Sequence, residues 1–195
     1  VEIKLADDGE ILTRSPGIFL GYFKNPEATA ETIEPDGWMH TGDVGEWDED
    51  GFLRIVDRKK DIIITAGGKN ISPSEIENKL KVSPFVKEAM VIGDRRKFLT
   101  ALIGIEFDTV ANWALRKNIT FTTYRDLSEK DEVIRLIQRA VDKANEHFAR
   151  VETVKKFKLI PKELDHEEGE LTATQKIKRT ALADQFSELI EGMYA

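Results

Sequence analysis

The chain of 195 residues is 41% hydrophobic and 33% charged, which is typical of a soluble globular protein with one or two domains. Its net charge of −7 argues against general binding to nucleic acid, and no apolar run approaches the length of a membrane span. The lack of cysteine excludes disulfides, thiolate catalysis and zinc–thiolate sites, and it fits a reducing, cytoplasmic setting.

The start of the chain predicts a β-hairpin. Apolar and charged residues alternate over residues 1–5, Asp7-Asp8-Gly9 predicts a turn, and residues 10–13 can return as the partner strand. Because the sequence begins inside a strand and has no initiator Met, we expect a natural or engineered truncation of a longer protein.

A short helix and a second hairpin follow. The helix is expected over residues 25–33, with Asn25 as its cap and Pro26 at its first position. The hairpin turns at residues 48–51 and returns through residues 52–56. So many short strands joined by turns favour part of a β-barrel or β-sandwich.

From about residue 58 the pattern changes to mixed helix and strand. Ser72-Pro73-Ser74-Glu75 has the form of a capping box, and Ser83-Pro84 ends the helix that it begins. Two strands are then expected, over residues 86–92 and 98–106.

The last third of the chain is predominantly helical in pattern. Asp108 is expected to cap a short helix, and Ser128 is expected to cap a long amphipathic helix over residues 131–150. A short strand at residues 157–160 and a final amphipathic helix through residues 182–190 complete the prediction.

Thr41-Gly42-Asp43 is the first candidate site. Glycine lets the backbone turn sharply, and an aspartate beyond it can accept two hydrogen bonds from a vicinal diol such as a ribose. An ordinary surface turn is the alternative interpretation of this tripeptide.

A charged run, residues 57–61, lies where the two patterns meet. It can be a solvated linker, which is the usual fate of a charge run. Alternatively, Arg58 binds a ribose or a phosphate, and Lys60 lies at a hinge where backbone torsions change as one domain moves over another.

Gly67-Gly68-Lys69 resembles a phosphate loop only superficially, because the spacing of a Walker motif is missing. The two glycines more readily allow a ligand or another backbone to come close.

Lys176 lies in a threonine-rich stretch after an acidic run. One ammonium group on a loop could neutralise the charge that develops on a phosphoryl group during transfer. The alternative is a surface lysine near the start of a helix. The three histidines, His40, His147 and His166, are too scattered for a triad or a metal site, so no chemistry and no metal ligand is assigned to them.

The order of these motifs resembles the carboxyl-terminal part of the adenylate-forming superfamily: acyl-CoA synthetases, firefly luciferase and the adenylation domains of nonribosomal peptide synthetases. The matching blocks are GYFKNPEAT at residues 21–29, GWMHTGD at 37–43, GFLRIVDR at 51–58, GGKNISPSEIE at 67–77 and LTATQK at 171–176. Residues 57–63, 67–73 and 171–179 look most like those of long-chain fatty acid CoA ligases.

The resemblance implies an α+β fold with two parts. Residues 1–57 would be the β-rich, barrel-like end of a large amino-terminal domain, and residues 58–195 a small mixed α/β lid that moves. It also implies two half-reactions. A fatty carboxylate attacks the α-phosphate of ATP–Mg²⁺ to give acyl-adenylate and pyrophosphate, and the thiol of coenzyme A then displaces AMP.

The resemblance also implies a role for each matching residue. Asp43 would hold the ribose hydroxyls with help from Arg58, and Lys60 would be the hinge. Lys176 would bridge the substrate carboxylate and the α-phosphate during adenylation. After the lid swings, the loop of Gly67 and Gly68 would replace Lys176 and line the pantetheine path.

Two departures from the family pattern limit what this chain can do. Ile64 stands where many relatives have a lysine, so the resemblance does not imply a phosphate contact from that position. The Ser/Thr/Gly-rich phosphate loop and the Tyr-Gly-x-Thr-Glu block of the large domain are absent, and with them the ATP cradle, the Mg²⁺ ligand and the acyl tunnel. We therefore expect the chain alone to be inactive.

Two other functions stay open from the sequence. A fatty acyl-AMP ligase would pass its acyl group to a carrier protein, and a free-standing binding module would borrow the lid fold without catalysis. The expected partners are a fatty acid, ATP, coenzyme A and the missing amino-terminal domain, without nucleic acid or a membrane span. A peripheral contact at the inner membrane surface is left open, and the oligomeric state is not predicted.

Overall fold

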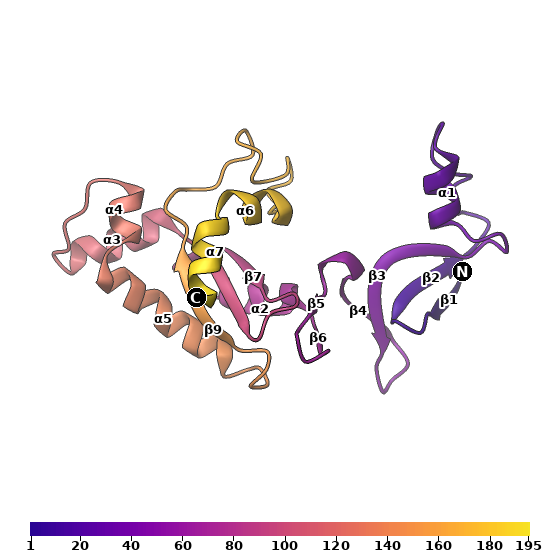
Figure 1. Ribbon diagram of the computed structural model, residues 1–195, viewed down its shortest axis with the longest axis horizontal. Helices are drawn as coiled ribbons and strands as arrows, with labels where there is room; N and C mark the ends of the chain where they lie inside the picture. Colours follow the sequence, from indigo (N-terminus) through magenta and orange to yellow (C-terminus); the bar gives the residue numbers. More distant parts are fainter. The chain divides into compact units, whose positions relative to one another are not determined.

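In the computed structural model, which describes residues 1–195, the chain folds as two units, Val1–Ile62 and Ile63–Ala195. The first unit is a four-stranded antiparallel sheet with the strands in sequence order (Figure 1). Its strands are β1 (Glu2–Leu5), β2 (Glu10–Arg14), β3 (Met39–Trp47) and β4 (Leu53–Arg58). Both predicted hairpins are thus confirmed.

The connection from β2 to β3 contains helix α1 (Pro26–Thr32), whose start was predicted correctly. The Asn25 side chain accepts a hydrogen bond of 3.0 Å from the backbone N–H of Ala28, and Pro26 takes the first helical position. The apolar run before this helix, residues 18–23, forms no strand. A short 3₁₀ helix, η1 (Lys59–Asp61), ends the unit.

The second unit is built on a three-stranded sheet in which β8 is central. β7 (Val86–Ile92) pairs with β8 (Leu99–Ile105) antiparallel, and β9 (Val154–Leu159) pairs with β8 parallel. A separate two-stranded sheet joins β5 (Ile63–Ile64) and β6 (Asn70–Ile71). The helices are α2 (Pro73–Leu80), α3 (Phe107–Arg116), α4 (Tyr124–Ser128), α5 (Asp131–Asn145), α6 (Arg179–Gln185) and α7 (Ser187–Tyr194).

Every residue of β8 is buried, because helices cover both faces of the sheet (Figure 1). Leu99, Ala101 and Ile103 belong to a core that includes α2, α3 and α5. Leu102 points to the other face, where it packs in a smaller core with α6 and α7. The predicted fold class, α+β with a β-rich part followed by a mixed α/β part, is confirmed.

Four predicted helix boundaries in this unit are wrong, and one of them is the end of the long helix, which is Asn145 of α5 instead of residue 150. Asp108 lies in the first turn of α3 instead of capping it, because Phe107 already belongs to the helix and stacks on Tyr124. Ser128 ends α4, where its hydroxyl donates to the Arg125 carbonyl at 2.9 Å. The final helix is broken at Phe186, whose backbone (φ −108°, ψ 25°) is bent where its side chain enters the smaller core.

Candidate functional site

A bulge in β3 shapes the first candidate site. Leu12 of β2 lies opposite His40, and Glu10 lies opposite Val44, so three residues of β3 face one residue of β2. The three residues are Thr41, Gly42 and Asp43, and Gly42 adopts a φ of +71°, which favours glycine. The predicted motif is therefore a turn-like interruption within a strand, a feature that often lies beside active sites.

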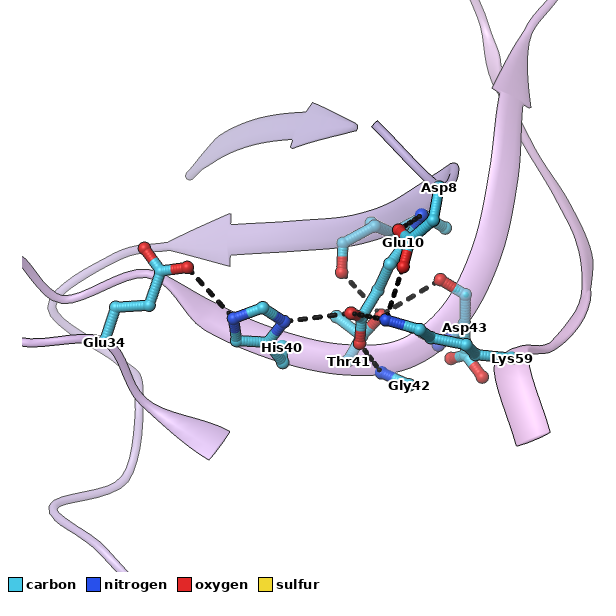
Figure 2. A network of polar contacts seen from close by, with 9 residues as sticks. Asp8, Glu10, Glu34, His40, Thr41, Gly42, Asp43 and Lys59 are labelled. Atoms are coloured by element: carbon cyan, nitrogen blue, oxygen red, sulfur yellow. Dashed lines mark hydrogen bonds and ion pairs between the residues drawn. The ribbon is translucent and has the colours of Figure 1, made fainter. Parts of the chain in front are cut away.

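Side chains replace the ladder hydrogen bonds that the bulge removes (Figure 2). The Thr41 hydroxyl donates to the carbonyl of Ile11 at 2.7 Å and accepts from the backbone N–H of Asp43 at 3.1 Å. The backbone N–H of Gly42 donates to a carboxylate oxygen of Glu10 at 2.9 Å. These bonds fix the backbone that leads into Asp43.

Asp43 and Arg58, which the sequence predicted as one site, are neighbours. They lie opposite each other on β3 and β4, and Arg58 Nη1 donates to Asp43 Oδ1 at 2.9 Å. Their side chains are 27% and 53% exposed, so both are accessible from solvent. A carboxylate paired with a guanidinium can accept hydrogen bonds from a diol on one side and bind an anion on the other.

Glu10 is the buried centre of a charged network that the sequence did not reveal (Figure 2). Its side chain is 5% exposed and lies 2.9 Å from both His40 Nδ1 and Lys59 Nζ. Lys59 also lies 2.6 Å from Asp8, and His40 Nε2 lies 2.9 Å from Glu34. The bonds therefore join β2, β3 and the 3₁₀ helix.

The network changes the proton affinities of its members. Burial alone would raise the pKa of the Glu10 carboxyl, but the hydrogen bonds from His40, Lys59 and Gly42 outweigh it and lower that pKa. The pKa of His40 is raised, chiefly by its hydrogen bond to Glu10 and further by the one to Glu34. Both effects favour a charged pair.

The sequence assigned no chemistry to His40 and overlooked Glu10. Their contacts join residues 30 and 49 positions apart, so no local spacing could have revealed them. The only signal available was a glutamate placed directly after the predicted turn Asp7-Asp8-Gly9.

Lys60 is an exposed residue of η1, and the first unit ends two residues later, at Ile62. The N–H of Ile62 donates to the Arg58 carbonyl at 3.2 Å across this turn. The predicted hinge residue thus lies next to the division between the two units.

Gly67 and Gly68 lie in the exposed loop between β5 and β6. Gly68 has a φ of +76° and donates its N–H to the Thr65 carbonyl at 2.8 Å. No atom lies within 4 Å of the position that a Cβ on Gly68 would take, so the loop has open space beside its backbone.

Lys176 is exposed on a tight loop that the bridge between Leu171 and Ile177 closes. The Thr172 N–H donates to the Lys176 carbonyl at 2.7 Å, and the Thr172 hydroxyl accepts the Lys176 N–H at 3.0 Å. Gln175 completes the turn with a φ of +60°. The loop is therefore ordered around a lysine whose side chain faces solvent.

Buried carboxylates hold both ends of this loop. Glu170 precedes it, is 1% exposed, and accepts from Lys162 Nζ at 2.8 Å and from the Asp165 N–H at 2.9 Å. Arg179 follows it and donates to Glu77 at 2.6 Å and to the Val91 carbonyl at 3.3 Å.

The groups around Glu77 do not fully offset the effect of burial on its pKa. Burial raises the pKa of the Glu77 carboxyl, while Arg179 and the Val91 N–H act in the opposite direction.

Two further findings describe the whole chain. No helix combines the length and the apolar character that crossing a membrane requires, and no group of three or more His, Asp or Glu side chains could hold a metal ion.

A family model described as the AMP-binding enzyme C-terminal domain matches residues 60–195. The long-chain-fatty-acid–CoA ligase FadD15 of Mycobacterium tuberculosis is 42% identical over 98% of this chain and 32% of its own length. The long-chain-fatty-acid–CoA ligase ACSBG1 of Bos taurus is 34% identical over 99% of this chain and 30% of its own length. The chain thus spans about a third of these curated relatives.

Solved structures show the same fold. The adenylation domain of a carboxylate reductase from Mycobacterium chelonae superimposes with a TM-score of 0.83 at 25% identity, covering 100% of this chain and 31% of that one. The O-succinylbenzoate coenzyme A synthetase of Bacillus subtilis, in complex with AMP, gives a TM-score of 0.62 at 26% identity, covering 92% of this chain and 32% of that one.

Proposed function

The chain belongs to the AMP-binding enzyme C-terminal domain family, and from this premise we propose that it is the carboxyl-terminal part of a long-chain fatty acid CoA ligase. The complete enzyme would join a fatty acid to coenzyme A through an acyl-adenylate, consuming ATP. Residues 1–57 would end the large domain, and residues 58–195 would form the lid. We assign a long-chain acid because FadD15 and ACSBG1 are long-chain-fatty-acid–CoA ligases.

The observation that carries the proposal is the pairing of Asp43 with Arg58 at 2.9 Å, with both side chains accessible to solvent. In the proposed complex the Asp43 carboxylate accepts hydrogen bonds from the ribose hydroxyls, and Arg58 keeps that carboxylate oriented and charged. The bulge supports this role. It interrupts the regular alternation of side chains along the strand, and such an interruption can redirect a side chain, here that of Asp43.

Lys176 would act in the first half-reaction. The attacking carboxylate and the α-phosphate are both anionic, so an ammonium group between them removes repulsion and stabilises the transition state. Its exposure on an ordered loop supports this role, since the side chain is free to enter a site while the backbone stays fixed. The ammonium offers nothing to a thiol attack.

The second half-reaction would therefore need the lid to move. Lys60 would absorb the change in backbone torsions, and the loop of Gly67 and Gly68 would then approach the bound pantetheine. The open space beside Gly68 supports this part of the proposal. Magnesium would accompany ATP, and we assign its ligands to the rest of the enzyme.

A Lys176→Ala substitution in the complete enzyme tests the proposal. Pyrophosphate exchange should fall roughly 100- to 1,000-fold, as expected for the loss of one preorganised charge at the reacting centre. Formation of the thioester from supplied acyl-adenylate and coenzyme A should be retained. Lys178→Ala is the matched control, because Lys178 is also exposed and follows on the same segment.

An equal loss in both assays would contradict the role given to Lys176. The same assays decide the acceptor. Thioester formation with coenzyme A supports the ligase, whereas transfer only to a carrier protein would identify a fatty acyl-AMP ligase instead.

A further inference from the structure

Glu10 is a buried acid for which the proposed function gives no role. One of its oxygens accepts the Gly42 N–H at 2.9 Å, and the other lies 2.9 Å from His40 Nδ1 and 2.9 Å from Lys59 Nζ (Figure 2). The donors come from the bulge of β3 and from η1, while Glu10 itself belongs to β2. One carboxylate thus joins three segments.

The bond to Gly42 matters because the bulge leaves that N–H without a ladder partner. Gly42 is half-buried, and a donor shielded from water is unfavourable without an acceptor, so the conformation of the bulge depends on an acceptor at this position. Gly42 immediately precedes Asp43, and its φ of +71° sets the direction in which the chain continues. A shift of Gly42 would therefore move the Asp43 carboxylate.

The bond to Lys59 connects Glu10 to the 3₁₀ helix η1. Lys59 stands between Arg58, which pairs with Asp43, and Lys60, the proposed hinge. Lys59 is held by both Glu10 and Asp8, but only Glu10 also contacts the bulge. This difference makes Asp8 a control for the charge around Lys59.

We propose that Glu10 is a positioning residue for nucleotide binding, which holds Asp43 in the orientation that recognises the ribose hydroxyls. This inference rests on the proposed function. Glu10 does not touch the nucleotide. It acts through the Gly42 N–H, and through Lys59 it fixes the segment that carries Arg58.

The test measures ribose recognition in the complete enzyme. Pyrophosphate exchange is followed with ATP and with 2′-deoxy-ATP and 3′-deoxy-ATP, and the ratio of kcat/KM values gives the preference for an intact diol. Glu10→Gln should lower that preference about tenfold, the effect of losing one hydrogen bond to a charged group. Asp8→Asn removes the charge beside Lys59 but keeps an oxygen that can accept the Glu10 N–H, which lies 3.1 Å from the Asp8 carboxylate, so it should leave the preference unchanged.

A change in stability alone would not alter this ratio, because all three nucleotides meet the same folded enzyme. Glu10→Asp provides a second variant, since it keeps the charge but is one methylene too short to reach Gly42. It should lower the preference as Glu10→Gln does. Full preference in either folded variant would overturn the proposal.

Asp43→Ala distinguishes a failure of the proposed ribose site from a failure of the positioning role given to Glu10. If Asp43→Ala leaves the preference for ATP unchanged, the proposed ribose site is wrong, whatever Glu10 does. If Asp43→Ala abolishes the preference and the Glu10 variants keep it, only the positioning role is wrong. The double variant Glu10→Gln/Asp43→Ala should show no further loss of preference beyond Asp43→Ala, because both residues act on the same contact.

A measurement on the 195-residue chain itself does not depend on catalysis. The Gly42 amide should exchange with solvent at least about tenfold faster in Glu10→Gln than in the unaltered chain, because its acceptor is weakened. Unchanged exchange at Gly42 would also overturn the proposal.

Discussion

At the scale of single residues, the site depends on where a β-ladder is interrupted. Asp43 is one of many aspartates in the chain, but it stands at the end of a bulge whose polar groups are bonded to Glu10 and Thr41. It also faces Arg58 across the neighbouring strand pair. The position of the residue in the sheet, more than its type, makes it suited to bind a diol.

His40 should make the stability of the first unit depend on pH. Glu10 and Glu34 bond its two ring nitrogens, and Lys59 and Asp8 are the other charges next to Glu10. The folded pKa of His40 is raised above its ordinary value of 6.5. The stabilisation from His40 is therefore complete below about pH 6.5 and is lost as the pH rises through the folded pKa.

Tryptophan fluorescence can follow this effect in one unit. Trp38 and Trp47 lie in the first unit, so in a Trp113→Phe background the signal reports that unit alone. The free energy of unfolding by urea should fall between pH 6 and pH 9, and His40→Gln should flatten this dependence. The same slope in both proteins would show that another group titrates. The lowered pKa of Glu10 adds a separate loss of stability only at acid pH.

The sequence predicted some of these residues and missed others for a physical reason. Asp43 and Arg58 belong to short motifs, so they were found, and the structure places them in contact. Glu10 and His40 act through partners that lie far away in sequence, and sheet pairing brings them together. Local patterns do not carry that information.

At the scale of elements, the loop of Lys176 is held by bonds beyond its own turn. Arg179 starts α6 and reaches both Glu77 of α2 and the backbone of β7. Glu170 closes the other end through Lys162. A lysine that must enter and leave a site needs a loop that moves with the unit, and bonds to its core elements provide this.

Arg179→Lys should therefore slow adenylation without unfolding the unit. A single ammonium cannot bond both the Glu77 carboxylate and the Val91 carbonyl in the geometry of the guanidinium. We expect pyrophosphate exchange to fall about tenfold, while thioester formation from supplied acyl-adenylate is retained. Arg95→Lys is the matched control, because the Arg95 side chain is 92% exposed and contacts only its neighbour Asp94. Parallel losses in both half-reactions would indicate a general defect in the fold.

Strands were easier to predict than helix ends. Alternation marked the hairpins of the first unit, and runs of mainly apolar residues marked β7 and β8. The start of α3 and the break in the last helix depend on packed aromatic side chains, Phe107 and Phe186. Such packing decides among several acceptable caps, so the sequence alone placed those boundaries incorrectly.

At the scale of the whole molecule, the first unit exposes several large apolar side chains. Leu20 is fully exposed and Phe23 is 89% exposed, and Phe52 and Ile55 are exposed on the later hairpin. Exposed large apolar side chains in this number favour a covered surface. The proposed large domain would cover it, which agrees with relatives about three times the length of this chain.

The proposed cycle requires two arrangements of the units, and Lys60→Pro tests it. Proline fixes φ near −65° and disfavours helical torsions at the preceding residue, so the chain at η1 could no longer exchange between two conformations. The ratio of the rates of adenylation and thioester formation should then change by at least about tenfold, because one arrangement is favoured. Lys60→Ala is the control. It removes the ammonium but leaves the torsions free, so both half-reactions should be retained. If Lys60→Pro left both rates unchanged, or if Lys60→Ala had the same effect as Lys60→Pro, Lys60 would not be a hinge.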